Sequence, residues 1–231
     1  MKTKVNVGCG LCAGPSWINI DGSWNSWFAN YPWLARLLTP VIGSGWRSWP
    51  KGIVYGNLST GEIPQPDAIA DCVFASHFFE HLTRTEGCHF LKECLRVLKP
   101  GGKIRIIVPD LEGAARCYLR ELELEVKAGR SQNKQCSGDK FMGGLFVCGP
   151  RRRWWVPADW YQAFHDYHRH FWMYDRQSLA AVAADAGFCE IKVGVAREKS
   201  EAPDIAEVER NEATGEDGLG FSLEGTKPYR L

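Results

Sequence analysis

The chain has 231 residues, 45% of them hydrophobic and 24% charged, which is typical of a single globular α/β domain with a core of its own. A net charge of +1 argues against bulk nucleic-acid binding, and the odd number of scattered cysteines, nine, favours reduced thiols over a disulfide framework. No apolar run reaches the length of a membrane span, so we expect a cytoplasmic protein.

The first two predicted strands surround a glycine-rich turn. The segment KVNV breaks at Gly8 and Gly10, and a second apolar run, WINI, ends at Asp21. Such a turn lets the backbone approach a ligand closely, and an acidic residue after the next strand can accept hydrogen bonds from both hydroxyls of a ribose. An ordinary turn with positive φ also requires glycine, so both interpretations stand at this point. The short interval between Gly10 and Asp21 argues against NAD.

An aromatic-rich segment at 23–51 interrupts the strand pattern and is predicted to be an insertion. It holds five tryptophans, contains an apolar helical stretch, WLARLL, and is closed by prolines. Tryptophan is common at membrane interfaces, so peripheral association with a membrane is one use of this segment. The alternative is that the rings pack over the core and cover a ligand.

Three further strands are predicted in the middle of the chain, at 52–58, 69–76 and 103–109. The last of them has an unbroken Ile and Val content, which is typical of a strand buried on both faces, so we expect a parallel sheet. A helix at 83–98 precedes that strand. Thr83 and Glu86 have the spacing of a capping box, and Pro100 with the two glycines after it is expected to end the helix.

The remainder of the chain is predicted to contain helices at 114–127 and 175–187 and strands at 189–195 and 219–225. A polar, glycine-rich and aromatic stretch at 129–172 forms a second insertion. Residues 199–218 are acidic and poor in apolar side chains, so we expect a mobile loop between the last two strands.

The segment SHFFEHL, residues 76–82, permits two interpretations. As His-x-x-Glu-His it matches the inverted zinc-peptidase signature, in which His77 and His81 lie on one helical face and Glu80 activates water. The apolar strand directly before His77 instead places the segment at a strand end, where an open α/β sheet binds its ligand. A zinc hydrolase is therefore the minor alternative.

Five segments of the chain resemble S-adenosylmethionine-dependent methyltransferases of the Rossmann-like class. They are VNVGCG, WINIDGS, DCVFASHFFEHL, FLKECLRVLKPGGKIRIIVPDLEG and FWMYDRQSLAAVAADAGF, and they cover about residues 3–110 and 170–195. The similarity is greatest to the type 11-like bacterial group often found with surface-polysaccharide enzymes. It implies an α/β fold with a Rossmann-like, mostly parallel seven-stranded sheet and a final antiparallel strand. We expect one methyltransferase domain over 1–231, with insertions at about 23–51 and 129–172 forming an aromatic-rich cap on the acceptor side.

The resemblance implies a site for the cofactor S-adenosyl-L-methionine at the carboxyl ends of the first, second and fourth strands. Val7, Gly8 and Gly10 would face its methionine part, and Asp21 would face its ribose. Asn57 stands where the family has an acidic residue near the adenine, and its amide oxygen can still accept a hydrogen bond from the adenine amino group.

The same resemblance assigns the strand end at SHFFEHL to the cofactor site. Ser76 and His77 would face the methyl end of the cofactor, so no metal is expected there. His81, further along the turn, is expected to support its structure.

A general base is expected if the acceptor is a hydroxyl, whose pKa lies far above 7. The candidates are His77, Asp110 and His165, with His168 as a further one. Asp110 also stands between a strand and a helix, so a role as helix N-cap is the alternative. The histidines of HDYHRH, residues 165–170, do not have the spacing of a helix face, which favours a loop packed by aromatic rings over a metal cluster.

These features lead us to expect O-methylation of a saccharide or a related small acceptor, either a small molecule or a lipid-linked saccharide, and no nucleic-acid partner. Three arginines at 151–153 precede two tryptophans, a combination that suits an anionic group with a ring face and also a solvated basic turn. The alternative function is a protein that binds the cofactor without turnover and acts as the partner of a polysaccharide-biosynthesis enzyme.

Overall fold

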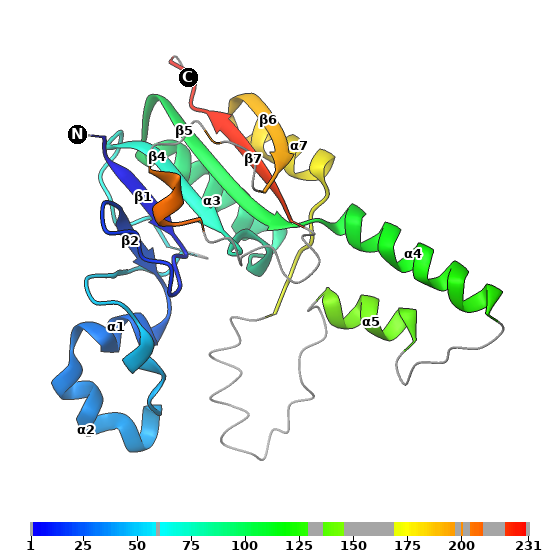
Figure 1. Cartoon of the computed structure of the whole chain (residues 1–231). Coiled ribbons are helices and arrows are strands. Elements are labelled where there is room, and N and C mark those ends of the chain that lie inside the picture. The colour runs from blue at the N-terminus through cyan, green and yellow to red at the C-terminus, as the bar shows by residue number, and fades with distance from the viewer. Residues whose placement is uncertain are drawn as a thin grey trace.

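The computed structural model describes residues 2–58, 61–128, 136–145, 169–196, 200, 204–209 and 220–229. In this part of the chain the strands form one seven-stranded sheet in the order β3-β2-β1-β4-β5-β7-β6 (Figure 1). The strands are β1 (Lys4–Val7), β2 (Ile18–Asp21), β3 (Val54–Tyr55), β4 (Ala70–Ser76), β5 (Leu98–Pro109), β6 (Cys189–Val195) and β7 (Gly220–Thr226).

All neighbouring strands from β3 to β5 pair in parallel, and β7 runs antiparallel to both β5 and β6. The predicted α/β fold, with its mostly parallel sheet and final antiparallel strand, is therefore confirmed. The strand order reverses beside β1, with β2 and β3 on one side and β4 and β5 on the other. Open α/β sheets bind ligands at such a reversal, outside the carboxyl ends of the strands.

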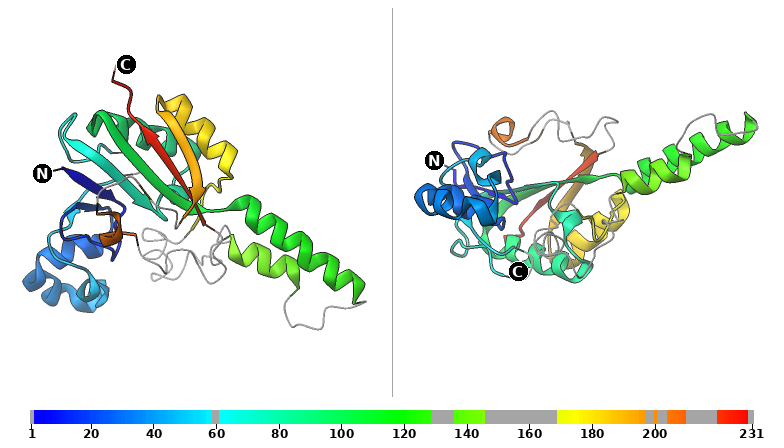
Figure 2. Two further views of the ribbon diagram at one scale, coloured as in Figure 1. Left: turned by 45° about the horizontal axis from the view of Figure 1, so that its top comes forward. Right: turned by 90° about the horizontal axis from the view of Figure 1, so that it is seen from below.

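The central strands are buried on both faces, as their apolar content predicted. Val73 and Ala75 of β4 belong to the large core cluster that includes the apolar residues of α3 (Arg84–Val97) and α7 (Arg176–Ala186). Phe74, between them in sequence, packs on the opposite face with Trp17. Figure 2 shows α3 and α7 on the same face of the sheet.

The second face is covered in part by residues 204–209, which include the short 3-10 helix η3 (Ile205–Glu207). Val208 is buried there beside Phe74. The Glu207 carboxylate accepts hydrogen bonds from the backbone N–H and the hydroxyl of Ser16 at 2.9 and 2.7 Å. The expectation of a mobile loop at 199–218 is therefore wrong for this short stretch, which packs against the sheet.

Helix α3 begins with the predicted capping box. The Glu86 carboxylate accepts from the Thr83 N–H at 2.7 Å, and the Thr83 hydroxyl accepts from the Glu86 N–H at 3.4 Å. The helix ends at Val97 and β5 begins with the next residue. Pro100 and its two glycines therefore lie within β5, which begins at Leu98 instead of at the predicted residue 103.

Helices α4 (Leu111–Lys127) and α5 (Ser137–Gly144) extend away from the sheet together (Figure 2). They pack through Tyr118 and Phe141, whose rings stack with centroids 4.9 Å apart. Helix α4 begins three residues before its predicted start at 114, because Asp110 caps it.

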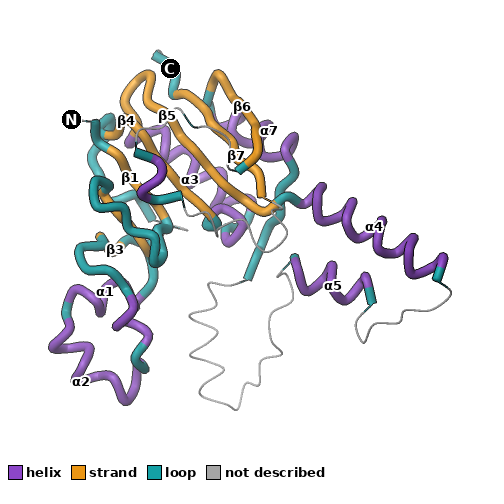
Figure 3. The backbone as a smooth tube through the Cα atoms, in the orientation of Figure 1, coloured by secondary structure: helices purple, strands orange, loops and turns teal. Residues whose placement is uncertain are grey.

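The first expected insertion forms α1 (Trp24–Asn30), α2 (Pro32–Ile42) and the 3-10 helix η1 (Gly45–Ser48), seen below the β2 and β3 edge in Figure 3. Its contact with the sheet edge includes Trp24 and Tyr55, whose ring centroids are 5.6 Å apart. Most of the second insertion lies outside the described residues, so the packing of both insertions over the cofactor stays a prediction. Among the described residues, no helix has the length and apolar content needed to span a membrane.

Candidate cofactor and acceptor site

The loop after β1 is fastened to the end of β2 by its own backbone. Gly8 and Gly10 have φ of +65° and +52°. The Gly8 N–H donates to the carbonyl of Ile20 at 2.9 Å, and the Gly10 N–H donates to Asp21 Oδ2 at 2.8 Å. The predicted glycine turn thus adjoins the predicted acidic residue.

The two glycines serve different purposes. A Cβ at Gly8 would lie 2.7 Å from the Cβ of Phe78, so only glycine lets this loop lie against the turn after β4. A Cβ at Gly10 would have no atom within 4 Å. The loop therefore has open space beside Gly10, next to the carboxylate of Asp21, and this is where a ligand can approach the backbone.

Asp21 is 9% exposed and both of its carboxylate oxygens accept backbone hydrogen bonds. Oδ1 accepts from the Ser23 N–H at 2.7 Å, and Oδ2 accepts from Gly10. Burial raises the pKa of Asp21, against the opposing effect of these two N–H groups. Because a carboxylate has about four acceptor positions, Asp21 can hold the loop and still accept from ligand hydroxyls.

Three other predicted cofactor residues occupy different environments. Val7 is fully buried in the core, so only its backbone is left to meet a ligand. Asn57 is exposed and separated from β3 by Gly56, and its carbonyl accepts from the Gly61 N–H at 3.1 Å. Ser76 is the half-buried last residue of β4. All three lie at the ends of the predicted strands, and their roles stay predictions.

His77 lies at the end of β4 in the left-handed region, with φ of +50°. This conformation is strained for a residue with a large side chain, and such strain is common at functional sites. The His77 N–H donates to the carbonyl of Ile107 at 3.0 Å. The following 3-10 helix, η2, spans Phe79–His81, so His77 and His81 do not share a helical face. The helical geometry of the zinc-peptidase interpretation is therefore wrong.

Glu80 carries a buried carboxylate at the centre of this turn. The residue is 1% exposed, and among the described residues neither carboxylate oxygen has a hydrogen-bond donor. Its Oε1 lies 3.3 Å from Nδ1 of His77 and 4.0 Å from Nε2 of His170. Burying a carboxylate is costly unless it is paired with a positive or hydrogen-bonding group. The imidazoles of His77 and His170 are the groups placed to act as such partners for Glu80.

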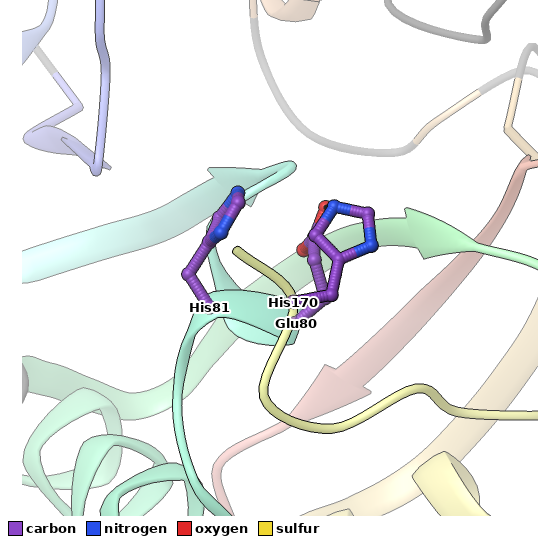
Figure 4. A group of neighbouring side chains, drawn as sticks. All are labelled: Glu80, His81 and His170. Atoms are coloured by element: carbon purple, nitrogen blue, oxygen red, sulfur yellow. Dashed lines mark ion pairs between the residues drawn. The ribbon is translucent and has the colours of Figure 1, made fainter. Parts of the chain in front are cut away.

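The segment before α7 is tied to this turn by backbone hydrogen bonds. The N–H groups of Phe171 and Trp172 donate to the carbonyl of Glu80 at 2.9 and 3.2 Å, and Nδ1 of His81 donates to the carbonyl of Arg169 at 3.0 Å. The rings of His81 and His170 meet edge to face at 5.0 Å (Figure 4). Burial lowers the pKa of His170, against the attraction of Glu80, so the neutral imidazole is favoured.

The sequence singled out HDYHRH but gave His170 no role and expected His81 only to support the turn. His170 stands far from Glu80 in sequence, so no local spacing could pair them. The one indication in the sequence that the two segments belong to the same site was that both resemble the same family.

The remaining candidate bases differ in how they are placed. Asp110 is the N-cap of α4, where its carboxylate accepts from the Gly113 N–H at 3.1 Å and lies 3.5 Å from Nη2 of Arg176. The alternative role as an N-cap is thus confirmed, and its catalytic role stays a prediction. His165 and His168 lie outside the described residues.

Comparison with known proteins relates the chain to methyltransferases. A family described as "Methyltransferase domain" matches residues 46–106, which contain β3, β4, α3 and much of β5. A curated relative, a probable S-adenosylmethionine-dependent methyltransferase of Mycolicibacterium smegmatis, is 41% identical over 58 residues. That match covers 25% of this chain and 21% of the relative, so the chain spans only about a fifth of the length of the curated protein it matches.

Solved structures of methyltransferases also align with the chain. A SAM-dependent methyltransferase from Archaeoglobus fulgidus aligns with a TM-score of 0.48 at 14% identity, covering 98% of this chain and 86% of that one. A possible histamine N-methyltransferase from Thermotoga maritima aligns with a TM-score of 0.47 at 17% identity, covering 98% and 83%. The family match and the curated relative thus show that residues 46–106 and a 58-residue stretch of the chain are similar to methyltransferases, the relative being S-adenosylmethionine-dependent.

Proposed function

We propose that the chain binds S-adenosyl-L-methionine beside the Gly8–Gly10 loop and transfers its methyl group to a hydroxyl of a small acceptor, with saccharides as the acceptor class. One observation carries the proposal. The Gly8 loop lies directly against Phe78, so the predicted cofactor loop adjoins the turn that holds His77 and Glu80. A cofactor seated on this loop would meet an imidazole and a carboxylate at the strand end.

The residues at the β1 and β2 ends fit the cofactor. The open space at Gly10 admits a ligand against the backbone, and Asp21 has acceptor positions left for ribose hydroxyls. The cofactor supplies an activated methyl group on a sulfonium sulfur. The chain has to bind it, orient an acceptor in line with the sulfur–methyl bond and exclude water.

His77 is the proposed general base. Its Nδ1 lies 3.3 Å from Glu80 Oε1, an arrangement in which the carboxylate favours a proton on Nδ1 and leaves Nε2 as the acceptor. Nε2 is buried, and no described residue forms a hydrogen bond with it. This nitrogen is the one that can take the acceptor hydroxyl proton as the new oxygen–methyl bond forms.

The saccharide class rests on the sequence resemblance and on the aromatic insertions. Residues 24–49 and 151–172 contain all the tryptophans of the chain except Trp17. Trp172, whose backbone N–H donates to the Glu80 carbonyl, is 40% exposed, and Trp24 in the other insertion is 46% exposed. Exposed indole rings are suited to the apolar faces of sugar rings.

Binding and turnover test the proposal separately. Calorimetry with S-adenosylhomocysteine should show binding that falls by about 1.5 to 3 kcal/mol in Asp21→Ala, the range for a hydrogen bond to a charged group. The exposed Asp185→Ala is the matched control and should bind as the parent does. Unchanged affinity in Asp21→Ala would remove Asp21 from the site, and NAD should not bind.

Turnover is measured as S-adenosylhomocysteine release with free sugars, nucleotide sugars and lipid-linked saccharides in vesicles. Release with one of these classes supports the proposed reaction and identifies the acceptor. Cofactor binding without release by any of them would contradict it and favour the non-catalytic partner.

A further inference from the structure

Three side chains from two distant segments converge beside the proposed methyl-transfer edge. Glu80 and His81 belong to η2, and His170 belongs to the segment that leads into α7. One ligand-type atom from each residue lies within 4.8 Å of the other two. Figure 4 shows the three side chains rising on the same side of these segments.

The buried carboxylate of Glu80 is the group in this cluster that most needs a positively charged partner. The carboxylate of Glu80 is 1% exposed and receives no hydrogen bond from any described residue. A buried carboxylate is costly unless it is paired, and the imidazole nitrogens of His77 and His170 lie 3.3 and 4.0 Å from Glu80 Oε1 without forming a hydrogen bond with it. A bound cation would meet this requirement directly.

The two imidazoles are positioned as ligands commonly are. Metal-bound histidines usually donate their second ring N–H to a backbone carbonyl or a carboxylate, which fixes the ring. Nδ1 of His81 makes such a bond to the carbonyl of Arg169 at 3.0 Å, which leaves Nε2 with a lone pair. His170 has a side chain that is only 10% exposed, beside Glu80. The backbone bonds from Phe171 and Trp172 to Glu80 hold both segments in place.

We propose that Glu80, His81 and His170 bind one divalent transition-metal ion. Two imidazoles and one carboxylate suit Zn²⁺, Mn²⁺, Fe²⁺ or Co²⁺ better than Ca²⁺ or Mg²⁺, which prefer oxygen ligands. This departs from the sequence-based expectation that the site holds no metal. It also differs from the zinc-peptidase signature, in which His77 and His81 are the ligands and Glu80 is the base.

The site deepens the proposed function, on which its catalytic meaning rests. Three protein ligands leave coordination positions open, and an acceptor hydroxyl bound there would have a lowered pKa. Its proton passes to Nε2 of His77, and its oxygen forms the new bond to the methyl carbon. The sulfur–methyl bond breaks with its electron pair kept by sulfur, so no oxidant or reductant is needed.

Metal binding is tested first without cofactor or acceptor. Untagged full-length protein is stripped with chelator and titrated with Zn²⁺ by calorimetry and with Co²⁺ by visible absorption. We expect one equivalent of either ion and Co²⁺ absorption bands that report imidazole ligation. Failure to bind either ion stoichiometrically would overturn the proposal.

Variants assign the ligands. His81→Ala, His170→Ala and Glu80→Gln should each weaken Zn²⁺ binding by about 10-fold or more, since even residues that only support ligands cost 10-fold to 100-fold. His89→Ala is the matched control, because this exposed histidine of α3, whose Nε2 lies 3.3 Å from the Gly61 carbonyl oxygen, lies outside the cluster. Unchanged Zn²⁺ affinity in the three cluster variants would also overturn the proposal.

Two controls keep the result interpretable. Thermal unfolding in chelator identifies any variant that does not fold, and His81→Asn then replaces His81→Ala as the milder change. S-adenosylhomocysteine binding is measured on the same samples. A parent protein that binds the cofactor but no metal would refute the metal site alone, whereas a parent protein that binds metal but no cofactor would refute the proposed function alone.

Discussion

Gly8 and Gly10 both have positive φ, yet their surroundings predict different consequences of substitution. At Gly8 an added methyl group would overlap the side chain of Phe78. At Gly10 the only structural penalty is the left-handed backbone, about 1–2 kcal/mol for a residue with a Cβ. A substitution at Gly8 therefore reports the steric cost of a side chain, and a substitution at Gly10 reports contact with the ligand.

We expect Gly8→Ala to destabilise the protein by about 1–3 kcal/mol more than Gly10→Ala, because overpacking adds to the strain. Urea denaturation of both variants measures this difference. Gly10→Ala should instead weaken S-adenosylhomocysteine binding in a folded protein, because its methyl group enters the space proposed for the ligand. Equal stability of the two variants would contradict the contact with Phe78.

His77→Ala tests the proposed base. Turnover should fall by about 10²-fold, the lower end for a lost general base, while affinity for S-adenosylhomocysteine changes little. Single-turnover kinetics and calorimetry measure the two quantities, and His89→Ala again serves as the control. Normal turnover in His77→Ala would move the base elsewhere, with Asp110 and His165 next to be tested.

Among single residues, the sequence predicted those whose roles depend on the residues next to them in the chain. Gly8, Asp21 and His77 lie at strand ends that periodicity and glycine spacing located. The pairing of Glu80 with His170 depends on the contact between η2 and the segment before α7, and no local pattern contains that information.

Helix α3 is joined to the connection between β3 and β4 by a group of charged side chains. Arg96 donates to the Glu93 carboxylate at 2.8 Å, to the carbonyl of Ile63 at 2.9 Å and to Asp67 at 2.7 Å. Glu93 in turn accepts from the Ile63 N–H at 2.9 Å. These bonds from Arg96, with that from Ile63, hold the pKa of Glu93 below its usual 4.5 in spite of burial.

Glu93→Gln should therefore reduce the free energy of unfolding near pH 7 by about 1–2 kcal/mol, the difference between charged and neutral hydrogen bonds. Because the folded pKa is lowered, the stabilisation is complete above the unfolded value and is lost as pH falls through the folded value. The gap between parent and variant should thus narrow below about pH 4.5. Urea denaturation over this range measures it, with exposed Glu123→Gln of α4 as the control. A gap independent of pH would contradict the assignment.

The elements were predicted well where local chemistry defines their ends. Thr83 with Glu86 and the glycine at 187 mark the ends of α3 and α7, and both appear in the structure. The start of α4 was predicted three residues too late, and the bond from the Gly113 N–H to the Asp110 carboxylate defines it. The direct passage from Val97 into β5 was missed because proline and glycine ordinarily predict a loop.

On the scale of the whole molecule, Arg105 connects three parts of the fold. It is 2% exposed on β5 and bonds to Glu209 of the covering segment, to Glu224 of β7 and to the carbonyl of Ala196 after β6. These partners meet only after the sheet has formed, so the sequence of β5 gave no indication of them. The acidic composition of 199–218 was for the same reason taken to indicate a mobile loop.

Arg105→Met should destabilise the protein by about 3–5 kcal/mol, because it leaves two largely buried carboxylates without their cation. Chemical denaturation measures the loss, and limited proteolysis should find residues 204–209 more readily cleaved. Exposed Arg116→Met, on α4, provides the control. Parent-like stability and cleavage would show that the segment is held by its apolar contacts with Trp17 instead.

The contact between Gly8 and Phe78 also bears on how this protein can diverge. The two positions share one volume, so a larger residue at 8 is tolerated only together with a smaller one at 78. Among homologues, glycine at the first position should accompany an aromatic residue at the second, and the two should covary. A larger residue at one position without a smaller residue at the other would push the β1 loop away from the turn after β4. The proposed cofactor loop would then lie farther from the residues proposed to act on the acceptor.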